Sequence, residues 1–263
     1  MRVSKASLVV LAIWATGVLS WPHVFANDVP DLSGRWAMMQ IYPQTATLPF
    51  AGEVLRTSTV LQLVDVEQDG TALTLRDVYC HTDIDDGTSL VKTTIPSAFM
   101  QSLRPATRTA TLVAKSTVPA WRFVQPPYVE VRGAMLASPE TDPLPDDPED
   151  PRVFDQDGDG EPGLTVQVTI LGIVEGRTFL VQRVRYALDG AVLSNSAIDG
   201  SVVWSDEQSV LGATNPLLLV NTESAPDPHP EKHMFIMRRV EEGMTCERLL
   251  ETWREIFGIE QTS

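Results

Sequence analysis

Hydrophobic and polar residues alternate along most of the chain with the period of two that is typical of β-strands. The clearest hairpin joins residues 54–66, which are rich in Val, Leu and Thr, to residues 71–79 through a turn at Gln68, Asp69 and Gly70. A second hairpin is predicted over 178–187 and 191–204, with its turn at Asp189 and Gly190. Further strands are predicted at 90–95, 109–118, 128–136, 164–170 and 232–240.

Only the C-terminal segment changes to a helical period. Thr245 can cap the start of this helix and Gly258 can end it. Its apolar residues are Leu249, Leu250, Trp253, Ile256 and Phe257. The sequence therefore predicts an all-β fold: a single antiparallel β-barrel, or a closely packed sandwich, with one C-terminal helix on the sheet.

The chain is strongly acidic, with 20 Lys and Arg against 35 Asp and Glu and a formal net charge of -15. Such a surface repels nucleic acid and anionic lipid and attracts cations. No nucleic-acid partner is expected.

The first residues have the pattern of a secretory signal peptide. Arg2 and Lys5 precede an apolar run at 8–19, and Val24 and Ala26 supply small residues for cleavage. We expect a signal peptide at 1–26 and a single β-domain at 27–263, located in the periplasm or outside the cell, with no membrane span after cleavage. The alternative is an uncleaved anchor, but the apolar run is short for a bilayer.

The two cysteines, Cys80 and Cys246, lie at the end of a predicted strand and at the start of the predicted helix. In an exported chain the expectation is a disulfide bond between them, and the alternative is two free thiols. Such a bond ties the C-terminus to the N-terminal half and so favours one domain.

An acidic, proline-rich segment at 139–163 is predicted to be an irregular loop. Within it Asp155, Asp157 and Asp159 alternate with Gln156 and Gly158. In a tightly wound loop this alternation brings hard oxygen ligands together, so the sequence predicts a calcium site. Position twelve is Val166 instead of a bidentate Glu, so the missing ligands are expected from waters, the Glu161 carbonyl or an upstream carboxylate. The alternative is a turn without metal.

Two short motifs resemble known families. The loop, which runs straight into a strand, resembles the calcium loops of FG-GAP repeats in integrin-type propellers. Leu32, Gly34 and Trp36 resemble the opening of calycin barrels, the lipocalins and avidins, in which the Trp plugs one end of the barrel. The wider pattern resembles exported β-proteins of proteobacteria with a single calcium loop.

No catalytic motif is recognised in the sequence. His229 and His233 have a zinc-like spacing, but Pro228 and Pro230 exclude the helix that would place both on one face, so a polar loop is predicted. The function predicted is an exported, calcium-stabilised β-barrel acting as a binding or structural protein, with calcium and a small-molecule ligand in the lumen as partners. The alternatives are an extracellular interaction module and an enzyme whose site assembles only in three dimensions.

Overall fold

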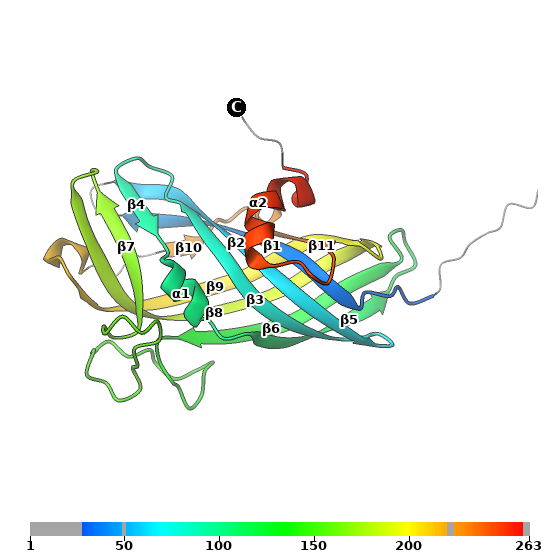
Figure 1. Ribbon diagram of the computed structural model, residues 1–263, viewed down its shortest axis with the longest axis horizontal. Helices are drawn as coiled ribbons and strands as arrows, with labels where there is room; N and C mark the ends of the chain where they lie inside the picture. The colour runs from blue at the N-terminus through cyan, green and yellow to red at the C-terminus, as the bar shows by residue number, and fades with distance from the viewer. Residues whose placement is uncertain (1–27, 49–50, 220–223, 260–263) are drawn as a thin grey trace, which may run out of the picture.

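The computed structural model describes residues 28–48, 51–219 and 224–259. The predicted signal peptide lies outside these residues. Described residues form one large antiparallel sheet with a helix against its outer face (Figure 1). The strands are β1 (Gly34–Leu48), β2 (Gly52–Asp69), β3 (Ala72–Asp85), β4 (Val91–Thr94), β5 (Ala106–Ala114), β6 (Trp121–Arg132), β7 (Leu164–Ile170), β8 (Val174–Ser194), β9 (Ala197–Ala213), β10 (Ser224–Pro226) and β11 (Met234–Arg239). The helices are α1 (Ser97–Ser102), α2 (Cys246–Phe257) and the 3-10 turns Pro216–Leu218 and Pro230–Lys232.

Hydrogen-bonded neighbours follow the order β4-β7-β8-β6-β5-β3-β2-β1-β11-β9, and β9 also pairs with β8. Eight strands, β1, β2, β3, β5, β6, β8, β9 and β11, therefore form a circuit of antiparallel pairings that returns to its start. Each strand of the circuit pairs with the circuit strand that follows it in the sequence, and the last strand, β11, pairs with β1. The short strand β10 pairs with β1 outside it.

The strands β6 and β7 lie one after the other along the same edge of β8. Arg132, the last residue of β6, is opposite Gln182, and Leu164, the first residue of β7, is opposite Leu180. The acidic segment between β6 and β7 thus leaves the sheet, and β7 then continues the pairing along the same edge of β8. β4 and α1 lie between β7 and β3. β4 pairs with β7, and α1 contacts both β7 and β3.

The largest apolar cluster lies at one end of the circuit, around Trp36. This side chain is fully buried, and its indole N–H donates to the Leu32 carbonyl at 2.8 Å. The Arg239 guanidinium lies 5.1 Å from the Trp36 ring centre and donates to the carbonyls of Asp31 and Asn195. The Trp36 of the N-terminal motif is therefore buried in this cluster, with Arg239 packed over its ring.

The predicted C-terminal helix is confirmed as α2. Thr245 accepts a hydrogen bond from the Arg248 amide, and Gly258 ends the helix in the left-handed conformation. Leu249 and Phe257 pack against the outward-facing residues of β1 and β2, including Met39 and Leu61. Burial of this apolar stripe holds the helix against the sheet.

A disulfide bond joins Cys80 to Cys246, with a Cα–Cα distance of 5.1 Å. It links β3 to the first residue of α2, so the predicted pairing is confirmed.

The first predicted hairpin is confirmed as β2 and β3, but the predicted turn at Asp189 and Gly190 is wrong. β8 continues through both residues, and the chain turns between Ser194 and Ala197. Gly190 faces Gly200 across the strand pair, and a Cβ at Gly190 would lie 2.7 Å from the Phe235 ring. This glycine provides room for an aromatic side chain and does not form a turn.

Other strand boundaries shift by several residues. The structure has β5 and β6 at Ala106–Ala114 and Trp121–Arg132, each beginning earlier than predicted and ending earlier. The 139–163 segment is confirmed as irregular. No helix among the described residues is long and apolar enough to cross a membrane.

The first prediction concerns the disulfide bond. Replacing both Cys80 and Cys246 by Ser should lower the free energy of unfolding by about 4 to 5 kcal/mol, because the bond closes a long loop in the unfolded chain. Urea unfolding of the two forms measures this difference. An equal midpoint for both would show that the bond contributes nothing, and adding reductant to the native protein provides the control.

Candidate functional site

A cavity of about 210 Å³ lies inside the sheet, at the end away from Trp36. Most of its walls come from β1, β2, β3, β4, β7, β8, β9 and α1, and β6, β10 and the turn Pro216–Leu218 contribute one residue each. The apolar wall comes from β4, β7, β8 and the start of α1, and its residues are Val91, Ile95, Phe99, Val166, Val168, Ile170 and Leu180. The polar wall comes from β1, β2 and β9, and its residues are Gln40, Gln44, Arg56, Ser58, Asp206 and Gln208.

Next to the cavity is a layer of charged side chains that are buried and paired, and Tyr79 and Arg132 of this layer line the cavity itself. Asp77 and Arg108 are almost completely buried and form a two-pronged ion pair. Glu130 accepts hydrogen bonds from Tyr79 at 2.8 Å and from Arg132 at 2.9 Å. Burial opposes the charge of Glu130, but the Arg132 guanidinium and the Tyr79 hydroxyl hold the pKa of this carboxyl below its usual range. Each charge therefore has a partner of opposite sign, although one nitrogen each of Arg108 and Arg132 is buried without a hydrogen-bond partner among the described residues.

A third buried ion pair, at the polar wall, connects three strands. Arg56 on β2 lies 3.0 Å from Asp86, which follows β3. The same carboxylate accepts hydrogen bonds from the amide and hydroxyl of Thr93 on β4. This contact fixes β4 in the cavity wall.

Asp206 is the exception in this set. Its carboxylate accepts a hydrogen bond from the Gln182 amide at 2.8 Å, and no cationic group of the described residues is within ion-pair distance of it. Burial raises the pKa of the Asp206 carboxyl, although Gln182, Arg132 and Arg56 act in the opposite direction.

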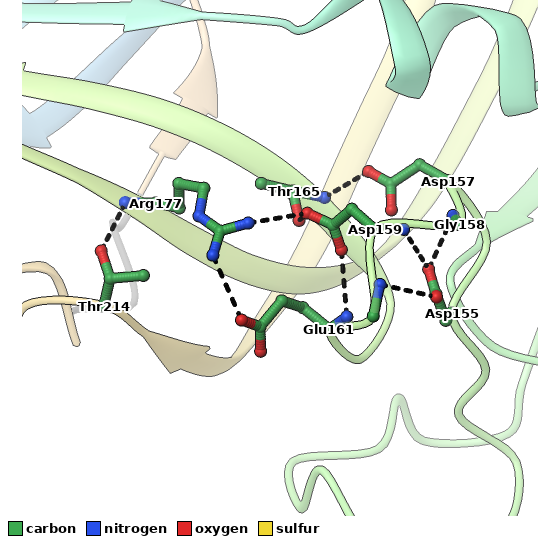
Figure 2. A network of polar contacts seen from close by, with 9 residues as sticks. Asp155, Asp157, Gly158, Asp159, Glu161, Thr165, Arg177 and Thr214 are labelled. Carbon is green, nitrogen blue, oxygen red and sulfur yellow. Dashed lines mark hydrogen bonds and ion pairs between the residues drawn. The ribbon is translucent and has the colours of Figure 1, made fainter.

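The acidic loop is outside the cavity, at the start of β7. One ligand atom from each of Asp155, Asp157 and Asp159 lies within 4.8 Å of the others. The structure thus brings the three predicted aspartates together (Figure 2). Asp155 organises the loop by accepting hydrogen bonds from the amides of Gly158, Asp159 and Gly160.

Asp157 is the aspartate whose environment fits a cation best. Its Oδ2 accepts the Thr165 amide at 2.9 Å, but its Oδ1 is buried with no hydrogen-bond partner among the described residues. Burial, together with the charges of Asp159 and Asp155, raises the pKa of the Asp157 carboxyl. A divalent cation would satisfy this oxygen and remove the repulsion.

Glu161, also predicted to be near the metal, has its side chain elsewhere. Its carboxylate lies 3.2 Å from Arg177, which also pairs with Asp159 at 3.0 Å (Figure 2). Of the upstream carboxylates, Asp150 pairs with Arg152 and Asp142 accepts the Ser138 amide. The described residues thus supply three carboxylates to the cluster.

The loop is anchored to the cavity wall. The Thr165 amide binds Asp157, and the Thr165 hydroxyl donates to Asp159 at 2.8 Å, whereas the next residue, Val166, lines the cavity. The Gln156 side chain accepts the Gly133 amide at 2.7 Å and donates to the Ser102 carbonyl. The loop therefore contacts the ends of β6 and α1 and the start of β7.

Among the described residues, no group of three metal-ligating side chains includes His229 or His233. However, His233 is buried, which a polar loop does not imply. Its Nδ1 accepts the Trp204 indole N–H at 2.7 Å, and its Nε2 donates to the Asp227 carbonyl. This histidine fixes the orientation of Trp204 in the cavity wall.

Comparison of the sequence with protein-family models finds no match, and comparison with curated protein sequences finds none either. The functional conclusions therefore depend on the site itself. The cavity residues were not predicted from the sequence, because each of its strands contributes only one to five of them. The inward alternation of β9 was the available signal, since Trp204, Asp206 and Gln208 have the same parity.

The second prediction tests the anchor of the loop. Gly163→Ala should destabilise the protein by about 1 to 3 kcal/mol more than Gly158→Ala. Both glycines have positive φ, but a Cβ at Gly163 would lie 2.3 Å from the Leu180 carbonyl oxygen, whereas a Cβ at Gly158 meets nothing within 4 Å. Urea unfolding of the two variants isolates the steric effect from the shared backbone cost. Equal losses would show that the loop start can shift away from β8.

Proposed function

We propose that this chain is an exported binding protein in which the eight-strand circuit is a closed barrel and the cavity holds a small ligand. The observation that carries the proposal is the cavity of about 210 Å³ with one apolar and one polar wall. A cavity of roughly 150 Å³ with apolar walls is large enough for benzene. A ligand with an apolar body and a polar end fits the two walls.

The pairings support the barrel. A circuit of eight antiparallel strands has no free edge around its circumference, which is how up-and-down barrels avoid edge-to-edge association. The buried Trp36 beneath Arg239 supports the calycin resemblance of the N-terminal motif. The disulfide bond supports an oxidising, extracytoplasmic location.

The ionisable groups next to the cavity also bear on the enzymatic alternative. Tyr79, Glu130 and Arg132 converge there, as an active site would require. Tyr79 and Arg132 both donate to Glu130, Arg132 also donates to Gln182, and the pKa of Glu130 is lowered, so the group is suited to hold the fold rather than to transfer protons. Binding is therefore the function that we propose.

Calcium completes the proposal as a stabilising ion. Asp155, Asp157 and Asp159 would hold it, with the unpaired Asp157 Oδ1 as the best-placed ligand. Oxygen ligands in an irregular loop suit Ca²⁺ better than Mg²⁺, which requires regular octahedral geometry. By ordering this loop the ion would fix the start of β7, which forms part of the apolar wall.

The third prediction tests the cavity. Val168→Phe should abolish binding of the neutral dye N-phenyl-1-naphthylamine, because Val168 lines the cavity and the larger ring fills it. Gln167→Phe is the matched control, since Gln167 is the preceding residue of β7 and is exposed. Dye fluorescence titrations measure both. If the wild-type protein binds neither the dye nor octylamine, octanol or octanoate, the binding function is wrong.

The fourth prediction tests calcium. Millimolar Ca²⁺ should raise the melting temperature above its value in EDTA, by an amount equivalent to about 2.7 kcal/mol when the ion is at 100 times its dissociation constant. Mg²⁺ should substitute poorly. Asp157→Ala should remove the rise, whereas Asp147→Ala, an exposed carboxylate upstream, should keep it. Equal melting temperatures in Ca²⁺ and EDTA for the wild-type protein would show that the loop is only a turn.

A further inference from the structure

The charges around the cavity identify the ligand class that it suits. Three arginines lie in or next to the walls, and each has a carboxylate partner: Arg56 with Asp86, Arg108 with Asp77, and Arg132 with Glu130. Once these pairs are matched, one carboxylate remains, that of Asp206. Among the described residues, the walls and the layer next to them therefore carry one carboxylate without an ion-pair partner.

Asp206 faces the cavity from β9, beside Gln182 of β8. Its Oδ2 accepts a hydrogen bond from the Gln182 amide, and its Oδ1 has no donor among the described residues. Burial raises the pKa of this carboxyl, so the charged form is costly without a nearby cation. A cationic ligand would supply the missing charge, whereas an anionic ligand would add a second.

Aromatic rings lie next to this carboxylate. Trp204 is two residues before Asp206 on the same face of β9. The Tyr42 ring lies edge-on to the Trp204 ring, with 5.2 Å between the ring centres. The bond from Trp204 to His233 holds the indole in place. An ammonium group at Asp206 can therefore also contact the face of an aromatic ring, which favours it further.

We infer that the cavity selects small amphiphiles with a protonated amine, which pairs with Asp206 beside Trp204 while the apolar body contacts β4 and β7. This inference rests on the proposed binding function. Simple alkylamines are protonated at neutral pH, as lysine is. The acidic surface of the protein would also concentrate such cations near the cavity.

The test is calorimetric titration of the wild-type protein with octylamine, octanol and octanoate, which share one chain length and differ in the charge of the head. We expect octylamine to bind about tenfold or more tightly than octanol, because a buried charge-assisted hydrogen bond exceeds a neutral one. Octanoate should bind most weakly. This order is measured without any variant and so does not depend on whether a substitution folds.

Asp206→Asn supplies the second measurement. It should reduce octylamine binding to the level of octanol while leaving octanol binding unchanged, since the amide keeps the shape and removes the charge. Glu207→Gln is the matched control: the same loss of charge one residue away, on a side chain that is 55% exposed and paired with Arg183. It should leave all three affinities unchanged.

The outcomes separate the two proposals. If octanol or octanoate binds as tightly as octylamine, the inferred selectivity is wrong and the binding function stands. The same conclusion follows if Asp206→Asn and Glu207→Gln reduce octylamine binding equally. If none of the three compounds binds the wild-type protein, the binding function fails, and the inference fails with it.

Discussion

The architecture depends on the pairing of one long strand along both of its edges. β8 has 21 residues, pairs with β9 along one edge, and pairs with β6 and then β7 along the other. Because a strand has only two edges, the chain between β6 and β7 must leave the sheet and return at almost the same point. It does so at two glycines with positive φ, Gly133 and Gly163, where an added Cβ would lie 3.0 Å and 2.3 Å from the Leu180 carbonyl oxygen. A side chain at Gly163 would separate the acidic loop from β8.

The polar interior imposes a second constraint, which is that buried charges must be matched. An unpaired buried ion costs several kcal/mol, so each arginine near the cavity requires its own carboxylate. Arg108 and Arg132 are matched next to the cavity, and Arg56 is matched at its wall by a residue that also holds β4. Asp206 has no such partner among the described residues, and under the proposed function it would favour a cationic ligand.

Local signals were sufficient to predict some of these features. The helical period and its two caps predicted α2, and a turn flanked by alternating residues predicted the β2–β3 hairpin. Two cysteines left only one disulfide pairing within the chain, and the aspartate alternation predicted a cluster that the fold forms. Other features depend on contacts between distant residues. Asp189 and Gly190 have the composition of a turn, but the Phe235 ring requires glycine there within a strand. No local pattern relates Arg56 to Asp206, and their roles follow only from the circuit of strands.

The acidic loop and the cavity lie on opposite sides of β7. In β7 successive side chains alternate, so that Thr165 is bound by the aspartates outside while Val166 contacts the cavity inside. Under the proposed function, a cation that fixes Thr165 also fixes Val166, and a ligand that packs against Val166 also restrains Thr165. Thermodynamic linkage then requires the effect to be reciprocal: the factor by which calcium changes ligand affinity equals the factor by which the ligand changes calcium affinity. This coupling needs no movement of the eight-strand circuit. Both partners would act on β7, which lies outside the circuit and whose edges are held by β8 and by the four-residue strand β4.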